Sequence, residues 1–246
     1  MTDTETACWV YAVVPASTTV PDALDGVGSA PVRTIVHEGL AAVVGDVDLG
    51  GSPGSRADLL AHHDVLDTLR TTGPVVPVQF GSVLADDGDV RNSLLEARAD
   101  VLHDLLEQLA GRSQLNLRAR YVDDVVLGEV VRDDPRVAEL RQRTQGADET
   151  TSYVERVRLG ELVAEAIEHK RDDDAAMLLD RVLPLTAGHV LRETGGTDVL
   201  DVALLVDDEL RAELEDLLES LAEGVHERIR MQLVGPVAPF DFAGGI

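Results

Sequence analysis

The chain has 246 residues, of which 44% are hydrophobic, so it is long and apolar enough to form two compact domains. Its 46 acidic residues outnumber 21 basic ones, and the formal net charge of −25 disfavours binding to nucleic acid or to an anionic membrane. One cysteine, Cys8, excludes an intrachain disulfide, and no apolar run reaches the roughly 18–20 residues of a membrane span. We therefore expect a cytoplasmic protein without a secretion signal, a membrane partner or a nucleic acid partner.

The first part of the chain has the pattern of strands joined by short turns. Cys8–Val14 is a β-branched and aromatic run ended by a proline, which predicts a buried strand. Val32–Val47 contains two apolar runs separated by Glu38 and Gly39, the pattern of a hairpin. Val75–Gly81 predicts a further strand, and a helix is expected before it, beginning at about Arg56 and stopping at Gly73.

Two helices are predicted from apolar stripes at helical spacing, the one from Arg56 and a second over Asp89–Gly111. The inward positions expected for them are Leu59, His62, Leu66 and Leu69 in the first and Leu94, Val101, Leu105 and Leu109 in the second. The strand Gln114–Val122 then alternates apolar residues with Asn116, Arg118 and Arg120, which predicts one covered and one open face.

The rest of the chain reads as helices followed by strand, helix and strand. Residues 133–192 are helical in pattern, with expected breaks at the charged run 169–174 and at Pro184. Thr197–Asp208 predicts a strand whose closing aspartates, Asp207 or Asp208, cap a leucine-striped helix that ends at Gly224. Arg228–Gly235 predicts the last strand.

This order of elements favours an α+β fold built from two ferredoxin-like modules, each a split β-α-β sandwich, with extra helices in the second. We expect the N-terminal module over residues 1–84, a connecting amphipathic helix over 85–112, and the C-terminal module with its inserted helices over 113–246.

One proline-spaced phrase occurs twice, as Gly-Pro-Val-x-Pro-x-x-Phe. The residues that define the two copies are Gly73, Pro74, Pro77, Phe80 and Gly81 in the first, and Gly235, Pro236, Pro239, Phe240 and Phe242 in the second. Because proline lacks a backbone donor, each phrase is expected at a sheet edge, anchored by a phenylalanine. We therefore predict that the phrases are structural and occupy equivalent last-strand positions in two sheets.

A search for catalytic groups finds little. His62, His63 and Asp64 suggest a metal site, but adjacent helical residues point about 100° apart, so His62 is better explained as a buried structural residue. The run Asp172–Asp174 lacks the pattern of a calcium loop and is expected in a solvated turn. Gly26–Pro31 resembles half of a nucleotide-binding fingerprint but opens no helix. We expect no enzyme, no cofactor and no metal.

Several segments together resemble the GvpF/GvpL family of gas vesicle proteins. These are the opening strand "WVYAVV", the helix "AHHDVL", the phrase "VVPVQFGSVLADDGDV" and the closing phrase "GPVAPFDF". The sequence departs from the family's pattern at Gln79, where the family has Arg, at Val237, where it has Trp, and at Phe240, where it has Tyr. The resemblance covers nearly the whole chain.

The resemblance implies a non-enzymatic accessory or minor structural protein located at gas vesicles in the cytoplasm. It also implies two α+β domains, and as partners the hydrophobic gas vesicle shell protein and other gas vesicle assembly proteins. Two alternatives stay open. One is a small-molecule binder or enzyme on tandem ferredoxin-like domains, with His62, Arg118 and Arg120 around an anion. The other is a self-associating shell component.

Overall fold

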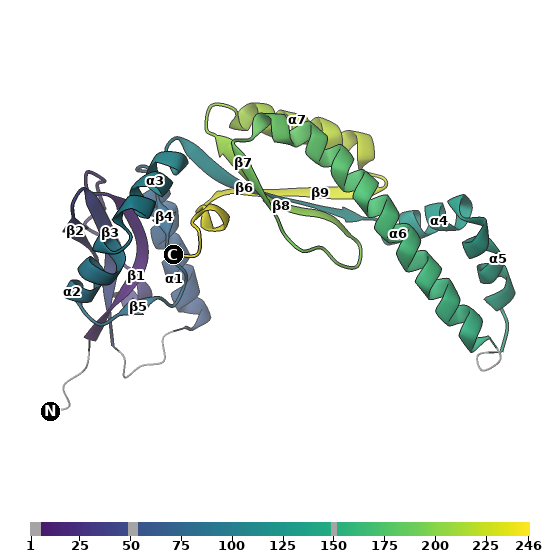
Figure 1. Cartoon of the computed structure of the whole chain (residues 1–246), viewed down its shortest axis with the longest axis horizontal. Helices are drawn as coiled ribbons and strands as arrows, with labels where there is room; N and C mark the ends of the chain where they lie inside the picture. Colours follow the sequence, from purple (N-terminus) through teal and green to yellow (C-terminus); the bar gives the residue numbers. More distant parts are fainter. Residues whose placement is uncertain (1–5, 49–53, 149–151) are drawn as a thin grey trace. The chain divides into compact units, whose positions relative to one another are not determined.

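The computed structural model describes residues 6–48, 54–148 and 152–246, and it confirms the mixed α+β class (Figure 1). The chain divides into two compact units, each built on an antiparallel sheet flanked by helices. Unit 1 comprises Met1–Gln114 and Gly235–Ile246, and unit 2 comprises Leu115–Val234.

The sheet of unit 1 has the strand order β2-β3-β1-β4, and β5 also pairs with β1. Its elements are β1 (Thr6–Pro15), the 3-10 turn η1 (Val27–Ser29), β2 (Val32–His37), β3 (Leu40–Asp48), α1 (Arg56–Arg70), β4 (Val76–Pro77), β5 (Val83–Leu84), α2 (Asp87–Asp89), the π-helix η2 (Val90–Glu96) and α3 (Ala99–Leu109). The predicted first strand, hairpin and first helix are confirmed.

β1 is the centre of unit 1, because residues 7–14 are all buried. On one side Trp9 and Tyr11 pack in a cluster with Leu66 and Leu69 of α1. η2 and α3 contribute further buried leucines and contact the sheet strands. A strand covered on both faces reads as a continuous apolar run, which is the pattern that "CWVYAVV" shows.

The helix predicted over Asp89–Gly111 is interrupted, and its inward positions are partly wrong. Leu94 is buried as expected, but Val101 is 55% exposed and Leu102 is buried in its place. The cause is η2, where the Ala97 amide bonds to the Asn92 carbonyl, five residues back. A π turn holds more residues than an α turn, so the buried positions that follow it are Leu102 and Leu106 in place of Val101 and Leu105, while Leu109 is buried as predicted. In the α-helix α1, His62, Leu66 and Leu69 are buried as predicted, whereas Leu59 is exposed.

The sheet of unit 2 has the order β7-β8-β6-β9, with α6 and α7 contributing to the cluster that covers it. The elements of this part are β6 (Arg112–Tyr121), α4 (Asp123–Asp133), α5 (Pro135–Thr144), α6 (Tyr153–Val182), η3 (Leu183–Leu185), β7 (Gly188–Leu191), β8 (Asp198–Asp207), α7 (Arg211–Val225) and β9 (Ile229–Val237). The 3-10 turn η4 (Phe240–Phe242) follows them and belongs to unit 1. The predicted alternation of β6 is confirmed, since Leu115, Leu117, Ala119 and Tyr121 are buried in that cluster.

The charged run 169–174 is not the turn that the sequence suggested. It lies inside the 30-residue helix α6, and Asp174 is buried, only 9% exposed. Three of its charged residues, Lys170, Arg171 and Asp174, contact other elements, whereas Asp172 and Asp173 are exposed. The predicted aspartate cap of α7 is also not what the structure has, since Leu210 occupies the N-cap position.

The closing residues differ in placement from the predicted module boundaries. Residues 235–246 group with unit 1, although the sequence placed them in a second module over 113–246. Ala238 is buried in the core of unit 1, and Phe240 packs against the same cluster. Residues 85–112, predicted as a connecting helix, likewise belong to unit 1.

Candidate functional site

The expectation of equivalent last-strand positions in two sheets is met in part, because the first phrase contains β4 and the second contains the end of β9, each the fourth strand and an edge of its sheet. The first forms the edge strand β4, with Pro77 inside the strand. In the second, Gly235 and Pro236 end β9, and Pro239 lies beyond that strand. The two copies therefore lie at different positions along their strands. Gly73 and Pro74 of the first copy come before β4, whereas Gly235 and Pro236 of the second copy lie inside β9.

Phe80 of the first phrase closes over the buried face of α1. Its ring lies edge-on to Trp9 at 5.2 Å and to His62 at 5.5 Å between ring centroids. His62 is fully buried and accepts a 3.1 Å hydrogen bond at Nδ1 from the Trp9 indole. Burial lowers the pKa of His62 from 6.5 to about 4, helped by the nearby His63 and opposed by the Val78 carbonyl. His62 is therefore a neutral core residue at physiological pH.

Phe240 of the second phrase packs on the neighbouring histidine, with 5.9 Å between its ring centroid and that of the exposed His63. The residue after it, Asp241, exchanges two hydrogen bonds with the Gln114 amide, at 2.6 and 3.2 Å. The adjacent histidines thus point to different partners, as their helical spacing requires. His62 packs against Phe80 of the first phrase, and His63 packs against Phe240 of the second.

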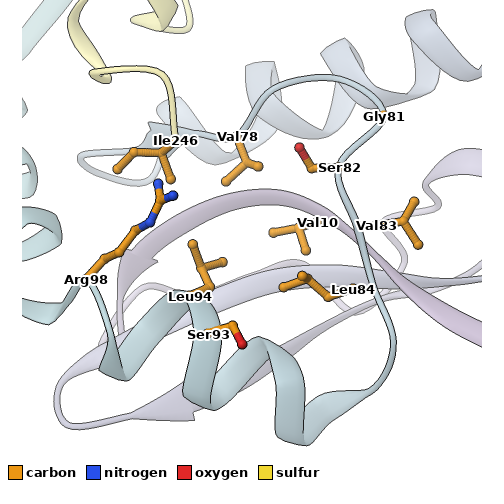
Figure 2. A pocket seen from close by; sticks show the side chains of 10 residues that line it. All are labelled: Val10, Val78, Gly81, Ser82, Val83, Leu84, Ser93, Leu94, Arg98 and Ile246. Carbon is orange, nitrogen blue, oxygen red and sulfur yellow. The ribbon is translucent and has the colours of Figure 1, made fainter.

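A cleft of about 410 Å³ lies beside the first phrase on unit 1 (Figure 2). Its lining residues are Val10, Val78, Gly81, Ser82, Val83, Leu84, Ser93, Leu94, Arg98 and Ile246. Apolar side chains from β1, β5 and η2 gather between the segment through Gly81 and the helix, with Arg98 at one end beside Ile246. Gly81 is the one residue of the ten named in the two phrases that lines this cleft. The sequence analysis did not predict a cleft here.

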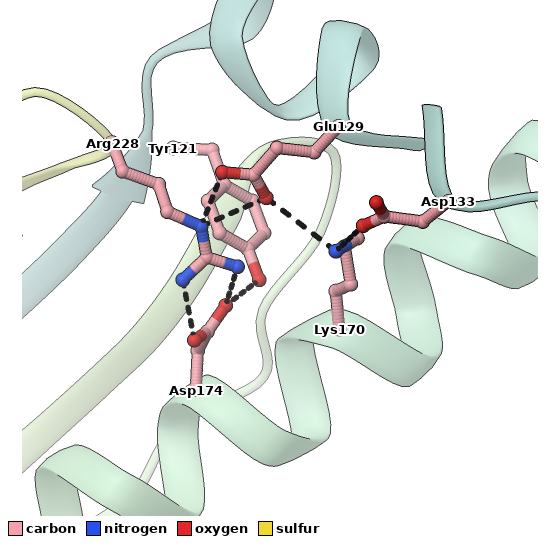
Figure 3. Close-up of polar contacts among 6 residues, drawn as sticks. All are labelled: Tyr121, Glu129, Asp133, Lys170, Asp174 and Arg228. Carbon is pink, nitrogen blue, oxygen red and sulfur yellow. Dashed lines mark hydrogen bonds and ion pairs between the residues drawn. The ribbon is translucent and has the colours of Figure 1, made fainter. Parts of the chain in front are cut away.

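Unit 2 contains a polar cluster of six residues from four segments, held together by hydrogen bonds and ion pairs (Figure 3). Arg228 binds Asp174 through two hydrogen bonds of 2.6 Å and Glu129 through bonds of 2.8 and 2.9 Å. The Tyr121 hydroxyl donates to Asp174 at 2.5 Å. Burial, together with this hydrogen bond, raises the pKa of Tyr121, and the bond to Asp174 raises the pKa of Arg228.

Lys170, the chain's one lysine, extends the cluster by bridging Asp133 at 2.8 Å and Glu129 at 3.5 Å. The cluster thereby joins α4 to α6, to the end of β6 and to the residue before β9. Because each of its three carboxylates contacts Lys170 or Arg228, the geometry suits a structural clamp rather than a reacting site.

The remaining candidates from the sequence are separate or engaged. Arg118 bonds to Asp201 at 2.6 Å and Arg120 to Asp198 at 2.7 Å, and His62 is buried in unit 1. Cys8 is buried, and this burial raises the pKa of its thiol. Over residues 6–48, 54–148 and 152–246, no group of three or more His, Cys, Asp or Glu side chains could hold a metal ion. No helix in these ranges is long and apolar enough to cross a membrane.

Residues 7–244 match the family model described as "Gas vesicle synthesis protein GvpL/GvpF". The chain belongs to the GvpL/GvpF family.

Among members of the GvpL/GvpF family, the chain is 27% identical over 237 residues to "Gas vesicle protein F" of Streptomyces sp. (strain CB03234), which covers 95% of this chain and 98% of the relative. It is 30% identical over 259 residues to "Gas vesicle protein L" of the same organism, covering 96% and 92%. The crystal structure of GvpF from Anabaena sp. PCC7120 superposes with a TM-score of 0.84 at 20% identity, covering 97% and 98% of the two chains, and so shares the fold. The family resemblance read from the sequence is thus confirmed.

Proposed function

We propose that this GvpL/GvpF chain is a non-enzymatic assembly or minor structural protein, acting at gas vesicles in the cytoplasm. It holds the hydrophobic shell protein or other gas vesicle proteins during assembly. The family match over residues 7–244 carries this proposal. Support also comes from the chemistry of the polar groups, since the buried acids and bases described above are engaged in ion pairs and packing.

Exposed apolar surface supports a role in protein binding. Val125 and Leu127 of α4 and Tyr153, Val154 and Val157 of α6 are between 37% and 76% exposed. Leu127 also lines a groove of about 360 Å³ between α4, α5 and α6, whose lining is mostly apolar but includes Asp124 and Arg141. Apolar patches on soluble proteins commonly mark contact sites for other proteins.

The test is coprecipitation of the full chain with each gas vesicle protein encoded beside it, together with electron microscopy of a deletion strain. We expect at least one protein to be retained and vesicles to be lost or malformed. Retention of none of them, with normal vesicles in the deletion strain, would overturn the proposal. Sedimentation of the isolated chain separates this function from that of a self-associating shell component.

A thermal-shift screen with metals, nucleotides and phosphorylated metabolites distinguishes the proposed function from the alternative, a small-molecule binder. Our proposal expects no reproducible stabilisation by any of these compounds, because the arginines suggested for an anion site already bind carboxylates.

We further propose that both units are split β-α-β variants and that the phrase residues are architectural. In each sheet, the second, third, first and fourth strands of the unit lie in that order. In unit 2, helices α4 to α6 connect the first strand to the second, whereas unit 1 uses a loop with η1 there. The helix before the last strand is α1 in unit 1 and α7 in unit 2.

A further inference from the structure

The cleft of unit 1 is formed where the chain leaves the sheet. Pro77 pairs with Ala12, and Val83 pairs with Trp9, so residues 78–82 stand opposite only two residues of β1. The excess forms an arch, closed by a hydrogen bond of 3.1 Å from the Ser82 amide to the Gln79 carbonyl. Gly81 lies in this arch with φ of 90°, a conformation that side chains other than glycine's disfavour.

The opposite wall of the cleft is η2, a π-helix, which is a rare element that occurs often at functional sites. It places Ser93 and Leu94 along the cleft, and Arg98 is the second residue after its end. Phe80 packs with Trp9 and His62 in the α1 cluster, so it holds the arch from the other face of the sheet. Packing of Phe80 thus holds one wall of the cleft, and the π-helix η2 forms the other.

The lining of the cleft contains one charged side chain. Arg98 is its one charged lining side chain, and it is exposed and has no hydrogen-bond or ion-pair partner within the described ranges. The Ser82 hydroxyl also has no partner there, whereas Ser93 donates to Asp89 at 2.6 Å. The other lining side chains are apolar apart from Gly81, which has none. Other exposed arginines, such as Arg91, also have no ion pair within the described ranges, but Arg98 is the one that lines this cleft.

We propose that this cleft binds a short apolar peptide segment of a gas vesicle protein, and that Arg98 pairs with a carboxylate on that segment. This inference rests on the proposed function and names the partner's chemistry at one surface. Arginine matches a carboxylate with two parallel hydrogen bonds, and the apolar floor covers the adjoining side chain. The overall charge of −25 repels other acidic segments, so one free arginine in an apolar cleft gives the contact its specificity.

The test measures binding of fluorescently labelled short peptides, tiled across the gas vesicle proteins encoded beside this chain, to the full chain by anisotropy. We expect at least one apolar, acid-bearing peptide to bind, and Arg98→Gln to weaken its binding by about tenfold or more, the loss expected for one charge-assisted hydrogen bond. The matched control is Arg91→Gln, an exposed arginine of η2 outside the cleft, which should leave binding unchanged.

A double-mutant cycle keeps the test independent of folding effects. Changing the peptide's acid to its amide should weaken binding to the unaltered chain but have little further effect on Arg98→Gln. Ser82→Phe, which fills the cleft, should also abolish binding.

Equal loss with Arg91→Gln, or additive effects in the cycle, would overturn the proposal, as would binding of free decanoate without any peptide. If full-length partners still coprecipitate equally well with Arg98→Gln, this cleft is not their contact, while the proposed function stands. If the unaltered chain retains no partner at all, the proposed function itself has failed.

Discussion

His62 shows how one buried side chain can make the stability of unit 1 depend on pH. Its pKa falls from 6.5 to about 4 in the folded chain, so unfolding takes up a proton between these two values. The stabilising contribution is therefore complete above pH 6.5 and is lost as the pH falls toward 4, on the order of 3 kcal/mol in all. Urea unfolding followed through Trp9 fluorescence across this range should show a falling midpoint.

The control for this prediction is the neighbouring histidine. His62→Leu should flatten the pH dependence whatever it does to absolute stability, whereas His63→Leu should keep the slope, because His63 is exposed. A slope that persists unchanged in His62→Leu would show that other groups cause it.

Gly26 illustrates a position where a missing side chain is required. A Cβ built there would lie 2.0 Å from the Tyr11 hydroxyl oxygen, which accepts a 2.8 Å hydrogen bond from the Val27 amide. Gly26→Ala should therefore destabilise unit 1 by about 1–3 kcal/mol through overpacking, measured by denaturant unfolding. Gly160→Ala in α6, where no atom lies within 4 Å of the added carbon, should instead be neutral or stabilising.

At the scale of elements, the clamp around Arg228 determines how α4 and α6 hold together. Asp174→Asn should destabilise unit 2 by about 2–4 kcal/mol, since Arg228 would lose its bidentate partner in a largely buried place. The adjacent Asp173→Asn provides the matched control, because that residue is exposed on the same helix. Hydrogen exchange in β8 measures the effect, and similar losses in both variants would contradict the assigned role.

Elements were predictable from the sequence where the local pattern decides their structure. The alternation in β6 and the Glu38–Gly39 turn depend on neighbouring residues alone, and both are confirmed. The stripe of α3 was shifted because nothing in the apolar spacing signals the wider π turn at η2. The prediction of a solvated turn at 169–174 was wrong because the partners of Lys170 and Asp174, which are Glu129, Asp133 and Arg228, lie far along the chain.

The candidate cleft could not have been found from the sequence for the same reason. The phrase containing Gly81 stood out as a motif, but its spacing does not show which residues face it. Arg98 and Ile246 join it only through the tertiary fold. The likeness of the two phrases was visible in the sequence, whereas their meeting in one unit depends on the path of the whole chain.

At the scale of the whole molecule, unit 1 is discontinuous, since residues 235–246 complete it. Removing residues 238–246 takes Ala238 and Phe240 from its core, and we expect a loss on the order of 3 kcal/mol, similar to that of a large core truncation. Trp9, the chain's one tryptophan, reports on unit 1, and exchange in β8 reports on unit 2. Loss confined to unit 2 would contradict this assignment.

Because unit 1 is discontinuous in sequence, it also cannot finish folding early in synthesis on the ribosome. Most of unit 1 emerges first, yet it waits for Ala238 and Phe240 until the whole of residues 115–234 has been translated. Ile246, which lines the cleft, arrives later still. A nascent chain therefore cannot present the finished cleft, so the proposed peptide binding there would begin only after translation has passed both units.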